Sequence, residues 1–163
     1  MAHRQLATTQ AQVAASPYQR RALSIAAELS QLVGWFCFNL GEYRNAQHYY
    51  DEARTLAHDA HNVELVTYVL CTMGHLATWQ GKPRVGIDHA IAAQAWAGQT
   101  ANPKAEAYAA DIAARAFAAD HEADRCRAVL DAEQTTLASL GRADPGLPLW
   151  YFYDESFYLG HQQ

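Results

Sequence analysis

Small residues recur in this chain at a spacing of 40 positions, and this repeat constrains the fold more than any other feature of the sequence. The pairs that share it are Gly34 and Gly74, Gly41 and Gly81, Ala46 and Gly86, and Ala53 and Ala93. A small side chain lets two helices cross with their backbones close together, and a glycine between two helical segments permits a tight turn. The spacing therefore predicts two successive helix hairpins of the same construction.

Apolar residues surround these small ones and indicate that the hairpins stack on one another. The expected core comprises Val33, Cys37, Leu40, Tyr50 and Leu56 in the first unit and Leu70, Met73, Ala77, Ile87 and Ala90 in the second. Each hairpin leaves one apolar face uncovered, so a neighbouring hairpin has to pack against it. We therefore expect a solenoid of stacked antiparallel helix hairpins.

The composition favours helices and argues against several classes of protein. Alanine supplies 33 of the 163 residues, which is typical of an all-α fold. Twelve Lys and Arg against 17 Asp and Glu give a net charge of -5, which argues against direct nucleic acid binding by this segment. The three cysteines are widely spaced and form no CxxC pair, as in proteins of a reducing compartment, and no apolar run is long enough for a membrane span. We expect a cytoplasmic protein that makes no membrane contact.

Proline and glycine positions mark the expected helix boundaries. Ser16 with Pro17, and Asn102 with Pro103, each have the pattern of an N-cap followed by the first helical residue. The predicted helices span residues 3–15, 17–40, 43–60, 63–80, 83–98, 103–118, 121–140 and 148–160. They form a single predicted domain, 1–163, of about seven or eight helices. Its repeats cover about 27–60, 67–100 and 103–140, with a partial fourth unit or a capping helix at 148–160.

The third unit departs from the pattern of the first two. Asp120 is expected where a turn glycine belongs, and Arg125 or Cys126 where a small residue belongs. We therefore expect the third hairpin to be less regular than the others.

Residues 34–57, GWFCFNLGEYRNAQHYYDEARTLA, carry a specific pattern. A small residue and an aromatic pair precede a turn glycine with an acidic residue and a tyrosine, and Ala46, Tyr50 and Ala53 follow. Residues 67–93 repeat this order, with Pro83 in place of the turn aromatic. The pattern resembles a tetratricopeptide repeat. That resemblance implies that the hairpins wind into a right-handed superhelix.

A longer similarity runs through the chain. It comprises AAELSQLVGWFCFNLGEYRNAQHYYDEARTLAHDA, then YVLCTMGHLA and, near the end, LWYFYDESFYLGH. In this order the segments resemble the C-terminal repeat region of actinobacterial XRE-type helix-turn-helix transcriptional regulators. The resemblance implies a sensor and dimerisation region, which in such regulators follows a DNA-binding domain. The chain has no candidate for that domain, so we expect either an excised sensor region or an independent relative.

The first helix of each hairpin lines the concave groove of a tetratricopeptide superhelix, and the resemblance places the candidate binding residues there. They are Gln31, Trp35, Phe38 and Asn39 in the first unit and Tyr68, Cys71, His75, Thr78 and Trp79 in the second. Aromatic rings beside amide and hydroxyl groups suit a protein or peptide ligand. The alternative is that Trp35 and Trp79 pack against an extra helix, for example residues 3–15.

The C-terminal segment is dense in aromatic residues, which are Trp150, Tyr151, Phe152, Tyr153, Phe157 and Tyr158. Such a density of rings has to be buried. The segment either caps the third hairpin within the chain or joins a symmetric homodimer.

Motifs for catalysis, metals and cofactors are weak. His58 and His61 have a spacing that a metal site could use, but spacing fixes no third ligand. Cys71 and His75 lie about one helical turn apart without an evident orienting group. Phosphate-loop, nucleophile-elbow and zinc-protease motifs do not occur. We predict a protein that is not an enzyme and has no metal or cofactor.

Three functions remain open on the sequence alone. The first is a protein- or peptide-binding repeat domain, the regulatory part of a bacterial transcription factor. The second is a scaffold or adaptor that self-associates through the C-terminal aromatic segment. The third is a small-molecule receptor whose pocket is lined by Trp35, Tyr68, His75 and Trp79. We favour the first.

Overall fold

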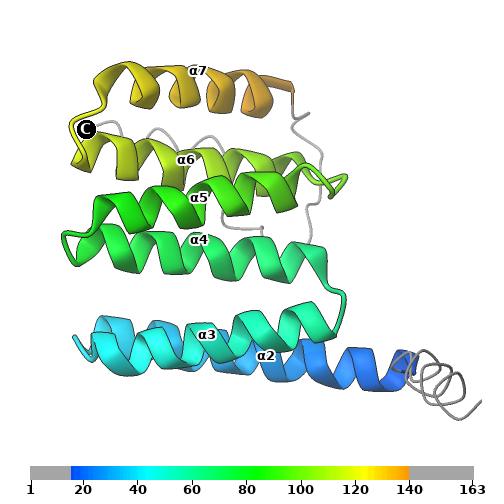
Figure 1. Ribbon diagram of the computed structural model, residues 1–163. Helices are drawn as coiled ribbons and strands as arrows, with labels where there is room; N and C mark the ends of the chain where they lie inside the picture. Colours follow the sequence, from blue (N-terminus) through cyan, green and yellow to red (C-terminus); the bar gives the residue numbers. More distant parts are fainter. Residues whose placement is uncertain (1–15, 140–163) are drawn as a thin grey trace, which may run out of the picture.

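The computed structural model describes residues 16–139, and within them the chain forms α-helices and no strand (Figure 1). The helices are α2 (Pro17–Asn39), α3 (Tyr43–Asp59), α4 (Val63–Trp79), α5 (Pro83–Ala97), α6 (Pro103–Ala119) and α7 (Ala123–Ser139). They pack as adjacent pairs, α2 with α3, α4 with α5 and α6 with α7, and the pairs follow one another along the molecule. The predicted all-α class and the pairing of consecutive helices are confirmed. The predicted helices 3–15 and 148–160 lie outside the described residues.

The helix boundaries follow the capping residues of the sequence. Ser16 Oγ accepts a hydrogen bond from the Gln19 N–H at 3.2 Å, and Gln19 Oε1 accepts one from the Ser16 N–H at 2.7 Å, so a capping box begins α2. Asn62 Oδ1 accepts from the Leu65 N–H at 3.1 Å and begins α4 in the same manner. The predicted starts at 17, 43, 63, 83 and 103 are confirmed, whereas α7 begins at 123 instead of 121.

The connections 40–42, 60–62, 80–82 and 120–122 are three-residue turns with one geometry. In the first, the Gly41 N–H donates to the carbonyl three residues earlier and the Glu42 N–H to the carbonyl five residues earlier, which is a Schellman turn. The middle residues have left-handed backbone and are Gly41 (φ 77°), His61 (φ 54°), Gly81 (φ 71°) and His121 (φ 61°). The prediction that Asp120 fills the glycine position is wrong by one residue, because Asp120 caps α6 and His121 makes the turn.

The small residues lie where the helices of a pair cross. An ideal Cβ atom built on Gly34 of α2 would lie 2.6 Å from ring atoms of Tyr50 of α3. One built on Gly86 of α5 would lie 3.1 Å from the carbonyl oxygen of Gly74 of α4. These distances leave no room for a side chain, so the recurrent glycines permit the close crossing that the sequence predicts.

The third pair keeps the frame of the repeat, but its second helix lacks the small residues of the earlier pairs. Cys126 is half-buried and occupies the position of Ala46 and Gly86, whereas Arg125 is exposed and lies over the Phe117 ring at 4.2 Å from its centroid. Glu133 is fully buried at the position that Ala53 and Ala93 hold in the earlier pairs. The third hairpin is therefore regular in its backbone and different in its packing.

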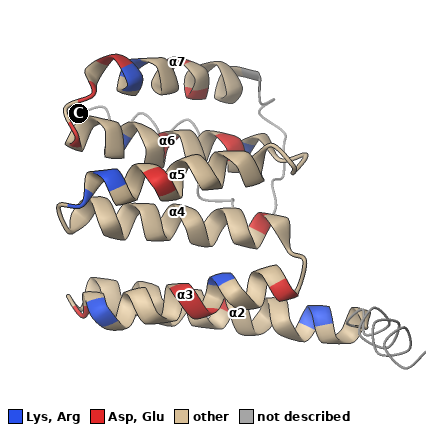
Figure 2. Ribbon diagram, in the orientation of Figure 1, with Lys and Arg blue, Asp and Glu red and all other residues tan. Residues whose placement is uncertain are grey.

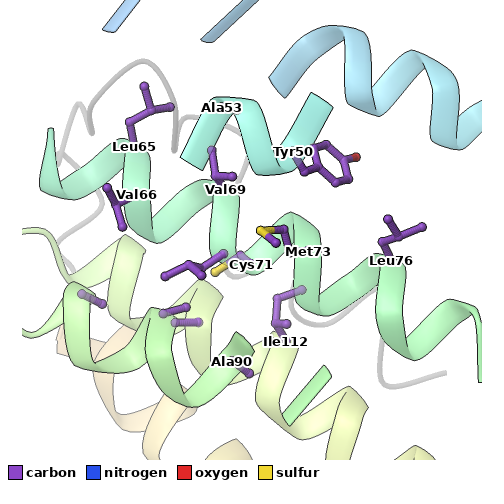
Figure 3. Close-up of a cluster of buried hydrophobic side chains, with 14 of the residues drawn as sticks. Tyr50, Ala53, Leu65, Val66, Val69, Cys71, Met73, Leu76, Ala90 and Ile112 are labelled. Carbon is purple, nitrogen blue, oxygen red and sulfur yellow. The ribbon is translucent and has the colours of Figure 1, made fainter. Parts of the chain in front are cut away.

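The core is centred on α4, where apolar residues of α3, α5 and α6 meet those of α4 (Figure 3). The predicted core residues of the second unit, Leu70, Met73, Ala77, Ile87 and Ala90, are all buried. Tyr50 and Cys37 of the first unit are buried as well, and Leu56 is half-buried. The prediction that Val33 and Leu40 lie in the core is wrong, because their side chains are 39% and 76% exposed.

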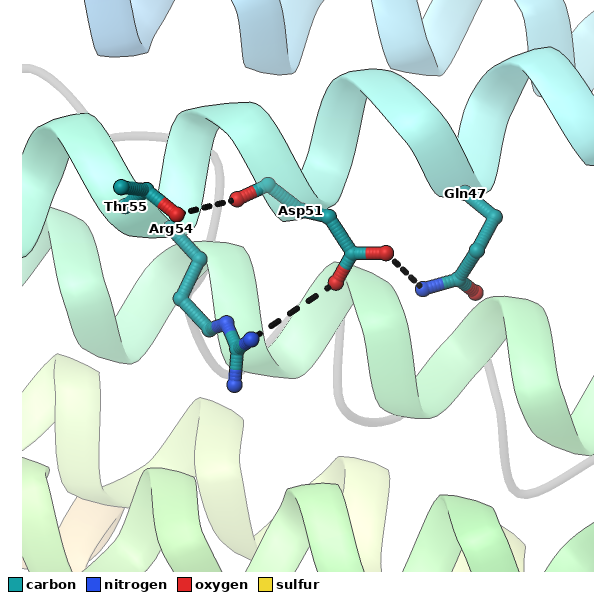
Figure 4. Close-up of polar contacts among 4 residues, drawn as sticks. All are labelled: Gln47, Asp51, Arg54 and Thr55. Atoms are coloured by element: carbon teal, nitrogen blue, oxygen red, sulfur yellow. Dashed lines mark hydrogen bonds and ion pairs between the residues drawn. The ribbon is translucent and has the colours of Figure 1, made fainter.

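The outward side of α3 is polar. Gln47 Nε2 donates to Asp51 Oδ2 at 3.2 Å, Arg54 approaches Asp51 Oδ1 to 3.8 Å, and Thr55 Oγ1 donates to the Asp51 carbonyl at 3.0 Å (Figure 4). Exposed pairs of this kind contribute little to stability, so they mark a solvated surface. None of the helices in the described part of the chain is both long enough and apolar enough to cross a membrane.

Candidate functional site

A pocket of about 270 Å³ opens on the side of the molecule formed by the first helix of each pair. Its lining comes from α2, α4 and α6 and consists of Trp35, Thr72, His75, Tyr108, Asp111, Ile112 and Arg115. Trp35, His75 and Arg115 follow one another at intervals of 40 residues, so each pair presents the same helix position to the pocket. The pocket is therefore a product of the repeat.

Aromatic rings extend from the pocket toward the end of α4. Phe38 is the centre of this group, with ring centroids 5.5 Å from Trp35, 5.3 Å from His75 and 5.9 Å from Trp79. Its contacts with His75 and Trp79 are edge-to-face, the geometry that aromatic pairs prefer. Trp79 Nε1 also donates to Tyr43 Oη of α3 at 3.1 Å. Despite these contacts Trp35 is 41% and Trp79 64% exposed, so both rings keep surface for a further contact.

The α6 side of the pocket is polar. Arg115 Nε donates to Asp111 Oδ2 at 2.8 Å, and the Asp111 side chain is far less exposed than that of Arg115. Tyr108 stacks on Tyr68 with centroids 6.0 Å apart. Burial, with Cys71 and Tyr68 as the largest charge effects, raises the pKa of Tyr108 well above its usual value. The phenol therefore keeps its proton at neutral pH and remains a hydrogen-bond donor.

The structure brings most of the predicted binding residues to this side of the molecule. Trp35 and His75 line the pocket, and Phe38, Tyr68 and Trp79 adjoin it through their ring contacts. We therefore take these five residues as the candidate site.

The remaining predicted residues are placed differently. Cys71 is fully buried in the core, and Gln31 is 8% exposed. Thr78 Oγ1 donates to the Gly74 carbonyl at 2.9 Å and lies against α5, within the helix pair. Asn39 is exposed, and its Nδ2 donates to the Trp35 carbonyl of its own helix at 2.8 Å. Cys71 and Thr78 thus serve packing, and their prediction as groove contacts is corrected.

The α6 residues of the pocket were not predicted from the sequence, although the repeat points to them. Adding 40 to Tyr68, Cys71 and His75 gives Tyr108, Asp111 and Arg115. The one-residue error in the third unit concealed this correspondence.

The described residues show no arrangement for metal binding or thiol chemistry. No group of three or more His, Cys, Asp or Glu side chains between residues 16 and 139 lies close enough together to hold a metal ion. Burial, with Asp111 nearby, raises the pKa of Cys71 well above its usual value. A nucleophilic cysteine needs the opposite shift, so the Cys71 and His75 pair lacks an activated thiolate.

Figure 2 shows Lys and Arg positions distributed along the helices among Asp and Glu positions. Comparison with protein-family models, with curated proteins and with solved structures finds no match to this chain. The resemblance to tetratricopeptide repeats therefore depends on the residues quoted above and stays a prediction.

Proposed function

We propose that this chain is a non-catalytic helical-repeat domain that binds a protein or peptide segment across α2, α4 and α6. The observation that carries the proposal is the pocket of about 270 Å³, whose wall includes the partly exposed Trp35 ring and the Asp111–Arg115 ion pair. In this proposal the helix pairs belong to a right-handed superhelix of the tetratricopeptide kind, and the pocket lies on its concave side.

The size of the pocket favours a peptide over a small-molecule ligand. Pockets that enclose drug-sized molecules measure about 300–1,000 Å³. A volume of about 270 Å³ suits one or two anchoring side chains of a longer ligand. Trp35 and His75 offer apolar ring faces to such an anchor, and Arg115 offers donors to a carbonyl or carboxylate group.

We further propose that this binding domain is the sensor region of a bacterial transcriptional regulator. The support is the order of the similar segments along the chain, and partner binding would then control a DNA-binding domain elsewhere in the regulator. A self-associating scaffold built on the C-terminal aromatic residues Trp150, Phe152, Tyr153, Phe157 and Tyr158 is the second candidate, and these residues lie outside the described part of the chain.

A displayed library of random peptides, selected on the immobilised full chain, tests the binding function. Selected peptides are then synthesised and titrated against the wild-type protein and the W35A variant by calorimetry. A ring that anchors a ligand contributes about 2 kcal/mol, so W35A is expected to raise Kd about 30-fold. The matched control is Y18A, because Tyr18 is an 87% exposed aromatic residue of the same helix outside the pocket.

Three results would contradict the proposal. One is a library selection that yields no peptide with saturable binding. The others are an equal loss of affinity in W35A and Y18A, and a loss in W35A that accompanies a lower unfolding temperature. The last result would show that Trp35 serves packing.

A further inference from the structure

One face of α2 is apolar and exposed along most of the helix. We call it the α2 stripe, and it consists of Ile25, Leu29, Leu32, Val33, Phe36 and Leu40. Each of these side chains is between 39% and 76% exposed. Their spacing of three and four residues places them on one side of the helix. The charged residues of α2 are Arg20, Arg21 and Glu28, none of which belongs to the stripe.

The repeat shows what this face is built to do. For the five stripe residues from Ile25 to Phe36, the equivalent residues 40 positions later are Leu65, Val69, Thr72, Met73 and Leu76 of α4, and 80 positions later Ala105, Ala109, Ile112, Ala113 and Ala116 of α6. None of these ten side chains is more than 3% exposed. The counterparts of Leu40 are Gln80 and Asp120, which are half-buried. On α4 this face receives the α2–α3 pair, and on α6 it receives the α4–α5 pair. The α2 stripe is therefore a stacking face on which, among the described residues, no helix pair is stacked.

The opposite end of the stack does not offer a matching surface. Asp124, Arg127 and Asp131 are exposed on α7, so head-to-tail stacking would bury charges against the α2 stripe. Residues 1–15 are also a poor cover, because their only large apolar side chains are Met1, Leu6 and Val13. Stripe-to-stripe contact, in contrast, pairs two apolar faces of equal length.

The charges at the ends of the stripe fit an antiparallel pair. Arg21 lies one turn before the stripe and Glu42 lies two residues after it, and both are exposed. When two α2 helices cross in opposite directions, Arg21 of each copy approaches the end of the other stripe, where the exposed Glu42 is followed by the exposed Arg44. A parallel pair would place like charges together at both ends.

We propose that a second copy of this chain covers the α2 stripe, and that the two α2 helices pack antiparallel about a two-fold axis near Leu32 and Val33. Such an isologous contact closes on itself and does not extend into a filament. Trp35 lies about a third of a turn from the middle of the stripe around α2, and Leu32 of the stripe lies one turn before it. The stripe therefore adjoins the side of α2 that carries Trp35.

Light scattering and sedimentation of the full chain, over a hundredfold range of protein concentration, test the dimer. The wild-type protein is expected to have twice the mass of the chain. The L29E/F36E variant places four carboxylates in the proposed interface, so its dimer dissociation constant is expected to rise at least about 100-fold with an unchanged helical spectrum. The control V85E/I91E changes two residues of α5 with 45% and 46% exposure and is expected to remain dimeric.

Cysteine cross-linking tests the direction of the helices. L32C lies near the proposed axis and is expected to form a disulfide-linked dimer under mild oxidation. L40C lies about 12 Å further along α2, so its two copies are about 24 Å apart and are expected not to link. The wild-type chain controls for its own three cysteines.

Three outcomes would overturn the proposal. The first is a wild-type monomer at every concentration, which would leave the stripe to a helix pair from another part of a longer protein. The second is a dimer that survives L29E/F36E, above all one that is lost on substitution of Phe152 and Phe157. The third is equal cross-linking of L32C and L40C, which would exclude the antiparallel arrangement.

Discussion

Replacing Gly34 with alanine tests whether the close crossing of α2 and α3 holds the first helix pair together. The new Cβ would lie 2.6 Å from two ring atoms of Tyr50 and 3.3 Å from the Ala46 carbonyl oxygen. The Tyr50 side chain is 1% exposed, so it cannot move aside without disturbing its neighbours. Overpacking of a filled core costs about 1–3 kcal/mol, whereas alanine is favoured over glycine within a helix by about 1 kcal/mol. We expect a net loss of about 1 kcal/mol in the free energy of unfolding.

The G98A variant supplies the matched control. Gly98 caps α5 with φ -62°, and the nearest atom to an added Cβ is the Gln94 carbonyl oxygen at 3.7 Å. This substitution restricts the unfolded chain without a clash and is expected to stabilise the protein by about 0.4–1 kcal/mol. Urea unfolding followed by circular dichroism measures both variants, and Tm should shift by about 2–4 °C for each kcal/mol. Equal stabilisation by G34A and G98A would refute the close-crossing argument.

Three further predictions concern pH, thiol reactivity and turn strain. Burial, and then the neighbouring Arg54, lowers the pKa of His89, so the His89 side chain binds a proton more tightly in the unfolded chain. The free energy of unfolding should therefore fall as the pH drops below about 6.5, and it should fall less in H89Q. Urea unfolding at several pH values measures this difference. Burial and the nearby Asp111 raise the pKa of Cys71. The Cys71 thiol should therefore resist a thiol reagent at mildly alkaline pH in the folded protein and react with it in urea. Mass spectrometry of the labelled protein measures the extent of this reaction. H121G should raise the free energy of unfolding by about 1 kcal/mol, because His121 has a left-handed backbone that glycine adopts without strain. A loss of stability in this variant would contradict the Schellman turn at this position.

Most helix boundaries were predictable because a local feature fixes them. An N-cap residue, a proline at the first position or a glycine in the turn marks most of them, and these act within a few residues of sequence. The turn at His121 could not be found in this way, because a histidine in left-handed backbone carries no compositional signal. Only counting 80 residues on from Gly41 locates it.

Burial on α2 was harder to predict because it depends on which neighbours are present. Val33 and Leu40 have the sequence character of core residues, and Met73, the counterpart of Val33 on α4, is buried. The same helix position is covered in one unit and exposed in another, since covering requires a preceding pair. No pattern within α2 distinguishes these two situations.

The candidate site was half predictable for a related reason. Trp35 and His75 are recognisable in the sequence as large rings with a polar nitrogen, each on the first helix of its pair. The structure places both in the pocket wall. Arg115 has the appearance of an ordinary solvated charge in the sequence. Its role depends on its distance of 40 residues from His75 and on the Asp111 carboxylate one turn before it, which holds it at 2.8 Å.

The internal repeats carry three different side chains at one position in the pocket wall. Positions 34, 74 and 114 keep a glycine or alanine, whereas the next position along each helix carries Trp35, His75 and Arg115. The frame therefore presents an indole, an imidazole and a guanidinium from one geometrical site on three successive first helices. Helices of this kind are about 10 Å across, so the three side chains span about 20 Å. An extended peptide rises about 3.3 Å per residue and needs about six residues to reach all three, with an apolar contact at one end and a carbonyl or carboxylate contact at the other.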